Sequence, residues 1–309
     1  MNKQTASNNP TLIGVSLALI AVIIWSGNYV IARGIIHNVP PISVAFYRWL
    51  VACLVILPFG YKSLKKDFPI LLQHKTYIFF AALTGVGLFN TFIYLAGHYT
   101  NAINLALIGT TVAPIIATVL AAIFLKEVLT SYRIVGMVVC FFGILVLLSQ
   151  GSWIRLYNSH FEKGDALMLV SALAFAIYNI LVRKKPITIS PLGFLVSTFI
   201  VGTLLIAPFY LYEKSVSVPV QWNKNLIFTF AYLGIGNSVI SFLCWNAAIK
   251  HLGAARTALF TNLIPIFSAI EAVLFINETF SNVHLISSAL IIGGLVIANF
   301  VKQPTTLNK

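Results

Sequence analysis

The chain is poor in charge. Only 9% of its 309 residues are charged, whereas 59% are hydrophobic and the mean hydropathy is +0.93. Soluble domains carry about 25% charged residues. A chain with so few charges cannot cover a water-facing surface, which excludes the ordinary soluble classes and indicates an all-α integral membrane protein.

Cysteines and acids are also scarce. Cys53, Cys140 and Cys244 all lie in apolar stretches, with no disulfide framework and no metal-ligand spacing, so we expect buried packing residues and no metal. The seven acids are scattered, and no phosphate-binding glycine motif occurs, so we expect no cofactor and no ATP-driven pumping. A membrane-embedded enzyme is disfavoured because clustered acids, metal ligands and a nucleophile with its base are all missing.

Ten apolar stretches approach the 20 or so residues that a helix needs to cross a bilayer core. They are 12–31, 42–58, 77–96, 102–125, 134–148, 166–182, 192–212, 226–249, 254–276 and 285–301. Their continuity excludes the short alternating segments of a β-barrel. The first stretch is too long for a cleavable signal peptide.

The net charge of +13 is explained by the orientation of the chain in the membrane rather than by nucleic-acid binding, because its basic residues are unevenly distributed between the two sides. Of the 20 lysines and arginines, Arg48 falls inside an apolar stretch. With the N-terminus inside, only Arg33, Arg155, Lys163, Lys214 and Lys224 fall outside, and the other fourteen face the cytoplasm. This asymmetry follows the positive-inside rule. It predicts an inner (plasma) membrane protein with both termini in the cytoplasm and the linker around Ser152 outside.

The two halves of the chain repeat each other. A shift of 151 residues places Pro114 on Pro265 and, thirteen residues later, Glu127 on Glu278. Five spans in each half mean that the second half enters the membrane inverted. We therefore expect two inverted five-helix repeats, residues 12–149 and 165–301, joined by a linker at 150–164, with the substrate site between them near the bilayer midplane.

Several segments carry a family likeness. They include "WSGNYVIARG" from Trp25, "FYRWLVA" from Phe46, "APIIATVLAAIFLKE" from Ala113 and "IPIFSAIEAVLFINE" from Ile264. With these segments the chain resembles the EamA-type exporters of the drug/metabolite transporter superfamily along about residues 12–301. The resemblance implies metabolite or amino-acid export through a cavity lined by the first, third, fourth, sixth, eighth and ninth helices.

Polar and aromatic residues on those helices are the candidates for the cavity wall. Three stripes recur at helical spacing: Asn90, Tyr94 and His98; Asn104, Thr111 and Thr118; and Ser238, Ser241 and Trp245. Trp25, Asn28, Tyr178 and Ser268 complete the predicted set. Such stripes also serve as hydrogen-bonding glue between helices, and His98 taken alone is more typical of an interfacial histidine than of a proton relay.

Pro114 and Pro265 interrupt equivalent apolar stretches, and each removes a backbone donor from its helix. They are read either as static bends or as hinges. Arg48 is expected to extend its guanidinium to the outer interface, or otherwise to pair with a carbonyl or carboxylate within the bundle. Glu127 and Glu278 are expected to mark the ends of their helices.

Glu271 lies about 9 Å along the helix from Pro265, well inside the bilayer. A charge at this depth costs at least about 2.5–3.5 kcal/mol, so such a residue usually faces a cavity or a partner. Two roles stay open for it: proton coupling, or a buried bond with Arg48 or a tyrosine. Glu271 has no acidic equivalent in the first half, where Leu120 takes its place.

These observations favour a secondary transporter in the lipid bilayer that exports a small metabolite, with a proton as the candidate coupling ion. A nucleotide-sugar or phosphate-ester exchanger of the same superfamily is the alternative, although such substrates need more buried cations than Arg48 alone. A binding or scaffold protein would not need an inverted repeat.

Overall fold

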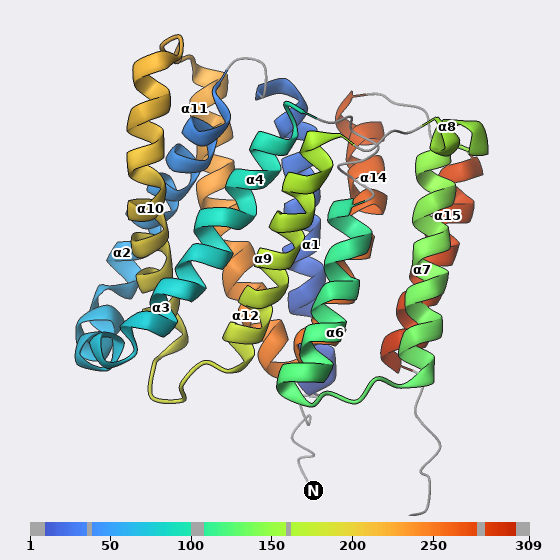
Figure 1. The fold of residues 1–309 in the computed structure, drawn as a ribbon, viewed down its shortest axis with the longest axis horizontal. Coiled ribbons are helices and arrows are strands. Elements are labelled where there is room, and N and C mark those ends of the chain that lie inside the picture. Colours follow the sequence, from blue (N-terminus) through green and yellow to red (C-terminus); the bar gives the residue numbers. More distant parts are fainter. Residues whose placement is uncertain (1–9, 36–38, 100–107, 159–161, 277–281, 301–309) are drawn as a thin grey trace, which may run out of the picture.

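The computed structural model describes residues 10–35, 39–99, 108–158, 162–276 and 282–300, and every regular element in this part of the chain is a helix (Figure 1). The first half contains α1 (Pro10–Ile35), α2 (Pro41–Gln73), α3 (Lys75–Ala82), η1 (Leu83–Leu88), α4 (Phe89–Ala96), η2 (Ile108–Val112), α6 (Ala113–Leu125) and α7 (Ser131–Ser149). The second half follows α8 (Trp153–Tyr157). It contains α9 (Lys163–Arg183), α10 (Pro191–Val216), α11 (Lys224–Ala231), η3 (Tyr232–Ile240), α12 (Ser241–Leu252), α13 (Ala254–Ala258), η4 (Leu259–Leu263), α14 (Ile264–Ile276) and α15 (Asn282–Phe300).

Eight helical runs in the described part of the chain are long and apolar enough to cross a membrane, and α6 is a shorter apolar helix. Large apolar side chains cover their outer faces. Phe59, Leu204 and Leu274, for example, are 76%, 65% and 68% exposed. An exposed apolar belt of this extent belongs in lipid rather than in water. The protein is therefore a multi-pass membrane protein, as the composition predicts.

The helices pack side by side in pairs, which are antiparallel in α7–α15 and α2–α10 and parallel in α6–α9 (Figure 1). The closest pairs are α7 with α15, α2 with α10, α1 with α12, and α6 with α9. Helix α1 begins and α15 ends at the same end of the bundle, whereas α8 lies at the opposite end (Figure 1). This places the segment after Ser152 away from the two described ends of the chain.

The pair α7–α15 is built around glycine. A Cβ atom added to Gly136 would lie 2.5 Å from the Gly294 carbonyl oxygen, and one added to Gly294 would lie 2.6 Å from the Gly136 carbonyl oxygen. The two backbones are therefore in direct contact. Small residues that allow such an approach are a common basis of helix association in membranes.

Pro114 and Pro265 both follow a change of helix type. The π-helical turn η2 precedes α6, where Pro114 occupies the first turn, and the 3₁₀ turn η4 precedes α14, whose second residue is Pro265. Because each proline continues a helical turn and has no backbone N–H, the helical hydrogen-bond ladder is interrupted at the junction. The irregularity therefore lies in the turn before each proline rather than in the α-helix after it.

All three cysteines are free, with Cys53 and Cys140 buried and Cys244 half-buried. This agrees with the expectation of packing residues. Cys140 donates to the Ile291 carbonyl across the α7–α15 contact.

Candidate functional site

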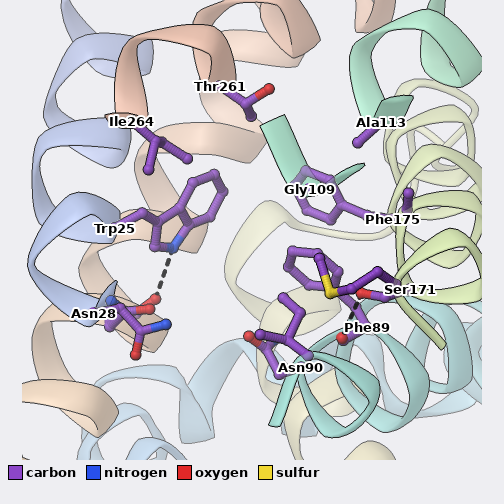
Figure 2. A pocket seen from close by; sticks show the side chains of 14 residues that line it. Trp25, Asn28, Phe89, Asn90, Gly109, Ala113, Ser171, Phe175, Thr261 and Ile264 are labelled. Atoms are coloured by element: carbon purple, nitrogen blue, oxygen red, sulfur yellow. Dashed lines mark hydrogen bonds between the residues drawn. The ribbon is translucent and has the colours of Figure 1, made fainter. Parts of the chain in front are cut away.

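A cavity of about 50 Å³ lies inside the bundle (Figure 2). Its wall is formed by Trp25, Asn28, Phe89, Asn90, Ile93, Gly109, Ala113, Met168, Ser171, Ala172, Phe175, Asn237, Thr261 and Ile264. These residues come from α1, α4, η2, α6, α9, η3, η4 and α14, which cover the first, third, fourth, sixth, eighth and ninth apolar stretches. The same six stretches are the ones that the family resemblance places around a central cavity. No lining residue carries a formal charge.

Aromatic rings line the middle part of the cavity (Figure 2). Trp25 and Phe175 meet edge to face with ring centroids 5.8 Å apart, and Phe89 stacks on Phe175 at 4.2 Å. Trp245 lies behind them, 4.8 Å from Trp25, and is fully buried. Asn28 and Asn90 lie toward one end of the cavity and Thr261 toward the other (Figure 2).

Arg48 on α2 is the buried cation nearest the lining residues, and it is only 1% exposed. Its Nε donates to Ser238 Oγ at 2.7 Å, and its Nη1 donates to Asn90 Oδ1 at 2.8 Å and to Tyr94 Oη at 3.0 Å. Its Nη2 donates to the Asn237 carbonyl at 3.2 Å. The expectation that Arg48 reaches the outer interface is therefore wrong. Four hydrogen bonds hold its guanidinium inside the bundle.

Helix α1 and the π-helical segment η3 are joined next to this arginine. Trp25 Nε1 donates to the Asn237 carbonyl, and Asn237 Nδ2 donates in return to the Ile24 carbonyl. Tyr232 Oη also donates to Ile24, at 2.6 Å. The Asn237 carbonyl therefore accepts from both Trp25 and Arg48, which links the aromatic wall of the cavity to the cation.

Glu271 is bound to α1 rather than to Arg48 or a tyrosine. Ser26 Oγ lies 2.7 Å from Glu271 Oε1, and Ser268 Oγ, one turn earlier on α14, donates to the Ser26 carbonyl at 3.0 Å. Glu271 Oε2 is buried and has no hydrogen-bond partner among the described residues. The expected hydrogen bond of Glu271 is therefore present, but its partner is Ser26 and not Arg48 or a tyrosine.

The other described acids stabilise helix N-termini. Glu213 accepts from the Ile42 and Ser43 amides at the start of α2, and Asp67 accepts from the Ser190 amide at the start of α10. Glu127 accepts from the Ala254 amide at the start of α13, and Glu162 and Asp165 form the capping box of α9. Glu278 lies outside the described residues. Among the described acids, Glu271 alone has no such role.

The predicted site residues separate into distinct groups. Trp25, Asn28 and Asn90 line the cavity. Tyr94 and Trp245 lie behind the wall, in contact with Arg48 and Trp25 respectively. The Thr111 side chain and Asn104 lie outside what the structure describes.

Five further predicted residues do not line the cavity. Tyr178 forms a hydrogen bond with Asn246. Ser241 Oγ donates to the carbonyl of Gly236 in the π-helical segment η3. Thr118 is buried on α6, with an Oγ1 that has no partner among the described residues. His98 is exposed just beyond the end of α4, which fits the interfacial reading of this histidine. Ser268 meets α1.

Sequence reasoning missed the apolar part of the wall, including Phe89, Met168 and Phe175. Their positions on cavity-facing helices were the only available signal. In a chain that is mostly apolar, such residues look the same whether they face lipid, a neighbouring helix or a cavity. No three His, Cys, Asp or Glu side chains of the described residues are grouped as a metal site would require.

A bundle of membrane helices around a small, mostly apolar cavity is an architecture that membrane transporters use. The chain belongs to the EamA-like transporter family, whose model matches residues 12–149 and 162–300. It is 27% identical over 264 residues to an uncharacterized transporter of Archaeoglobus fulgidus, covering 85% of this chain and 89% of that protein.

Two enterobacterial relatives have more specific names. The chain is 24% identical to a probable amino-acid metabolite efflux pump of Escherichia coli and 25% identical to one of Salmonella typhimurium. Each match covers 92% of this chain and 94% of the relative. A solved crystal structure shares the fold with a TM-score of 0.71 at 20% identity, covering 94% of this chain and 96% of the other.

Proposed function

We propose that the protein is a secondary transporter of the inner membrane that exports a small metabolite, with amino-acid metabolites as the leading class. The observation that carries this proposal is the cavity, which combines an aromatic wall with three asparagines between six apolar stretches of a transporter-family chain. Small-molecule sites are typically apolar pockets with a few placed polar groups. The names of the two enterobacterial relatives support the choice of substrate class.

The proposed architecture is ten membrane spans in two inverted repeats, residues 12–149 and 165–301, with the linker 150–164 outside and both termini in the cytoplasm. Two observations support it. The family model matches each half of the chain separately. The described ends of the chain lie at one end of the bundle and α8 at the other (Figure 1).

Transport then requires the two halves to move. A cavity of about 50 Å³ holds roughly three or four water molecules, so an amino acid needs a wider one. The irregular turns η2 and η4, each followed by a proline, supply the two places where the helices bordering the cavity bend with least loss of helical hydrogen bonds. We assign Pro114 and Pro265 to these hinges.

Glu271 is proposed as the proton-coupling residue. Ser26 Oγ lies 2.6 Å from the Ile23 carbonyl oxygen and 2.7 Å from Glu271 Oε1. A hydroxyl has one hydrogen to donate, and a carbonyl oxygen only accepts. Ser26 therefore either donates to an ionised Glu271 or accepts from a protonated one, so the same pair of side chains can hold Glu271 in both charge states. This supports a role for Glu271 in taking up and releasing a proton as the bundle alternates.

The test of the export proposal is a metabolite screen. Cells that overproduce the protein are compared with cells that overproduce a cavity-blocked variant, Ala172→Trp, by measuring intracellular and extracellular pools. Ala172 lines the cavity and is 2% exposed. The expected result is a set of small metabolites whose extracellular pools rise only with the unmodified protein. Equal pools in the two strains would contradict export.

A further inference from the structure

Arg48 is a buried positive charge that pairs with no acid among the described residues. Arg48 is 1% exposed, and all four of its hydrogen bonds go to neutral acceptors. The ion pair among the described residues joins Arg133 to Glu127, in a different part of the bundle. A buried charge without a counter-ion is costly in a membrane protein, and such residues usually mark a functional site.

Arg48 also determines how Asn90 is oriented. A guanidinium has only donors, so Asn90 must turn Oδ1 toward Arg48 Nη1, at 2.8 Å. The amide nitrogen of Asn90 then points away from the arginine. This Nδ2 atom is buried and has no hydrogen-bond partner among the described residues, although Asn90 itself is only 3% exposed and lines the cavity. An unsatisfied buried donor requires an acceptor.

Asn28 is oriented by the same cation through Tyr94. The Tyr94 hydroxyl oxygen accepts from Arg48 Nη1, which leaves the hydroxyl hydrogen free to be donated to Asn28 Oδ1, at 3.4 Å. Asn28 lines the cavity as well. Asn28 and Asn90 therefore have their oxygens occupied by the Arg48 network and have amide hydrogens left to donate. The third lining asparagine, Asn237, already donates through Nδ2 to the Ile24 carbonyl. Two such donors backed by a positive charge suit an acceptor that carries one negative charge.

We propose that Asn90 and Asn28 bind the carboxylate of the exported substrate, and that Arg48 is the positioning residue that orients them and supplies the compensating charge. The apolar body of the substrate then lies against Phe89, Phe175 and Trp25. The substrate class is a small monocarboxylate with an apolar side chain, including a zwitterionic amino acid. A phosphate ester with two negative charges would exceed the single cation, Arg48, that the described part of the chain places beside the cavity. This inference rests on the proposed export function and specifies its substrate.

The decisive variant is Asn90→Asp. Aspartate keeps an oxygen facing Arg48, so the bond at this position becomes an ion pair and the fold is retained. The second carboxylate oxygen replaces the unsatisfied donor and repels a substrate carboxylate. Asn246→Asp on α12 is the matched control, because Asn246 is half-buried, bonds to Tyr178 and does not line the cavity.

The probes are L-phenylalanine and L-leucine, each paired with the amine that has the same side chain and no carboxylate, phenethylamine and isoamylamine. Binding to the purified protein in detergent is measured by tryptophan fluorescence. We expect the amino acids to bind the unmodified protein and the Asn246→Asp control at least tenfold more tightly than the amines. In Asn90→Asp this preference should disappear or reverse, while the unfolding temperature stays equal or rises.

Equal binding of amines and amino acids to the unmodified protein would overturn the proposal, and so would unchanged amino-acid binding by Asn90→Asp. Failure of all four probes to bind would overturn it too. Arg48→Lys is a second variant, which keeps the positive charge but loses the planar set of guanidinium donors that orients the asparagines. We expect this variant to bind the amino acids less strongly relative to the amines than the unmodified protein does. The export screen decides the proposed function separately. Export of metabolites that lack a carboxylate would leave that function standing while removing this site.

Discussion

Ser26 and Glu271 lie 245 positions apart in the chain, yet their side-chain oxygens are 2.7 Å apart inside the bundle. This contact joins α1 to α14. A second hydrogen bond joins the same two helices, from Ser268 Oγ on α14 to the Ser26 carbonyl on α1. Release of a proton from Glu271 would leave a carboxylate whose Oε2 has no hydrogen-bond partner among the described residues. We therefore expect the contact between α1 and α14 to depend on the protonation state of Glu271.

The first prediction is that Glu271→Gln uncouples transport from the proton gradient. Glutamine resembles the protonated side chain but cannot release a proton. Gradient-driven transport in proteoliposomes should be lost, whereas exchange of substrate for substrate should continue. If Glu271 is only structural, the variant should instead lose roughly 1–3 kcal/mol of stability and keep its pH dependence. Thermal unfolding and transport at several pH values, measured on one preparation, distinguish these results.

The second prediction concerns topology. In a variant without the three native cysteines, single cysteines at Ser7, Ser152 and Thr306 are labelled with a membrane-impermeant reagent in intact cells. We expect the cysteine at position 152 to react and those at positions 7 and 306 to react only after the membrane is permeabilised. Labelling of positions 152 and 306 from the same side would contradict the inverted arrangement.

The third prediction separates Trp25 from Trp245. Trp25→Phe keeps a ring in the cavity wall and loses one donor to the Asn237 carbonyl, which still accepts from Arg48. Its main effect should be a several-fold rise in KM. Trp245→Phe leaves the Asn179 amide oxygen without its donor behind the wall, and should cost about 1–3 kcal/mol of stability with little change in KM. The opposite pattern would mean that the assignment of cavity and packing roles is wrong.

The fourth prediction uses two adjacent glycines of α15. Gly294→Ala would place a methyl group against the Gly136 carbonyl oxygen at 2.6 Å, whereas a Cβ atom at Gly293 meets nothing within 4 Å. Overpacking should destabilise Gly294→Ala by about 1–3 kcal/mol. Gly293→Ala should be neutral or gain up to about 1 kcal/mol, because alanine favours a helix. Similar unfolding temperatures for the two variants would contradict the close α7–α15 contact.

The fifth prediction concerns the reciprocal caps of α2 and α10. Asp67, near the C-terminus of α2, accepts from the N-terminus of α10, and Glu213, near the C-terminus of α10, accepts from the N-terminus of α2. Asp67→Asn and Glu213→Gln should each cost about 0.5–2 kcal/mol. The two costs should add, because the caps lie at opposite ends of the pair and share no partner. A double variant that costs clearly less than the sum would show that the caps depend on each other.

The sequence by itself determined the class of protein. Only helices and closed barrels satisfy every backbone hydrogen bond in hydrocarbon, and long continuous apolar runs select the helix. The family likeness also came from local segments such as the one at Ala113, and the match to the EamA-like family confirms it. Glu271 could be singled out without coordinates because an acid inside an apolar run is costly wherever its side chain points.

The tertiary structure alone decided what each polar residue meets. Arg48 was expected to reach the membrane surface, but its acceptors, Asn90 and Ser238, come from segments 42 and 190 residues away. No pattern within α2 reveals them. Tyr94 shares a stripe with the lining residue Asn90 yet lies behind the wall, and none of Ser238, Ser241 and Trp245 lines the cavity. Helix rotation and the π-helical turns η1 and η3 determine which side of each helix faces inward. Periodicity describes a face of one helix, and only packing decides what that face contacts.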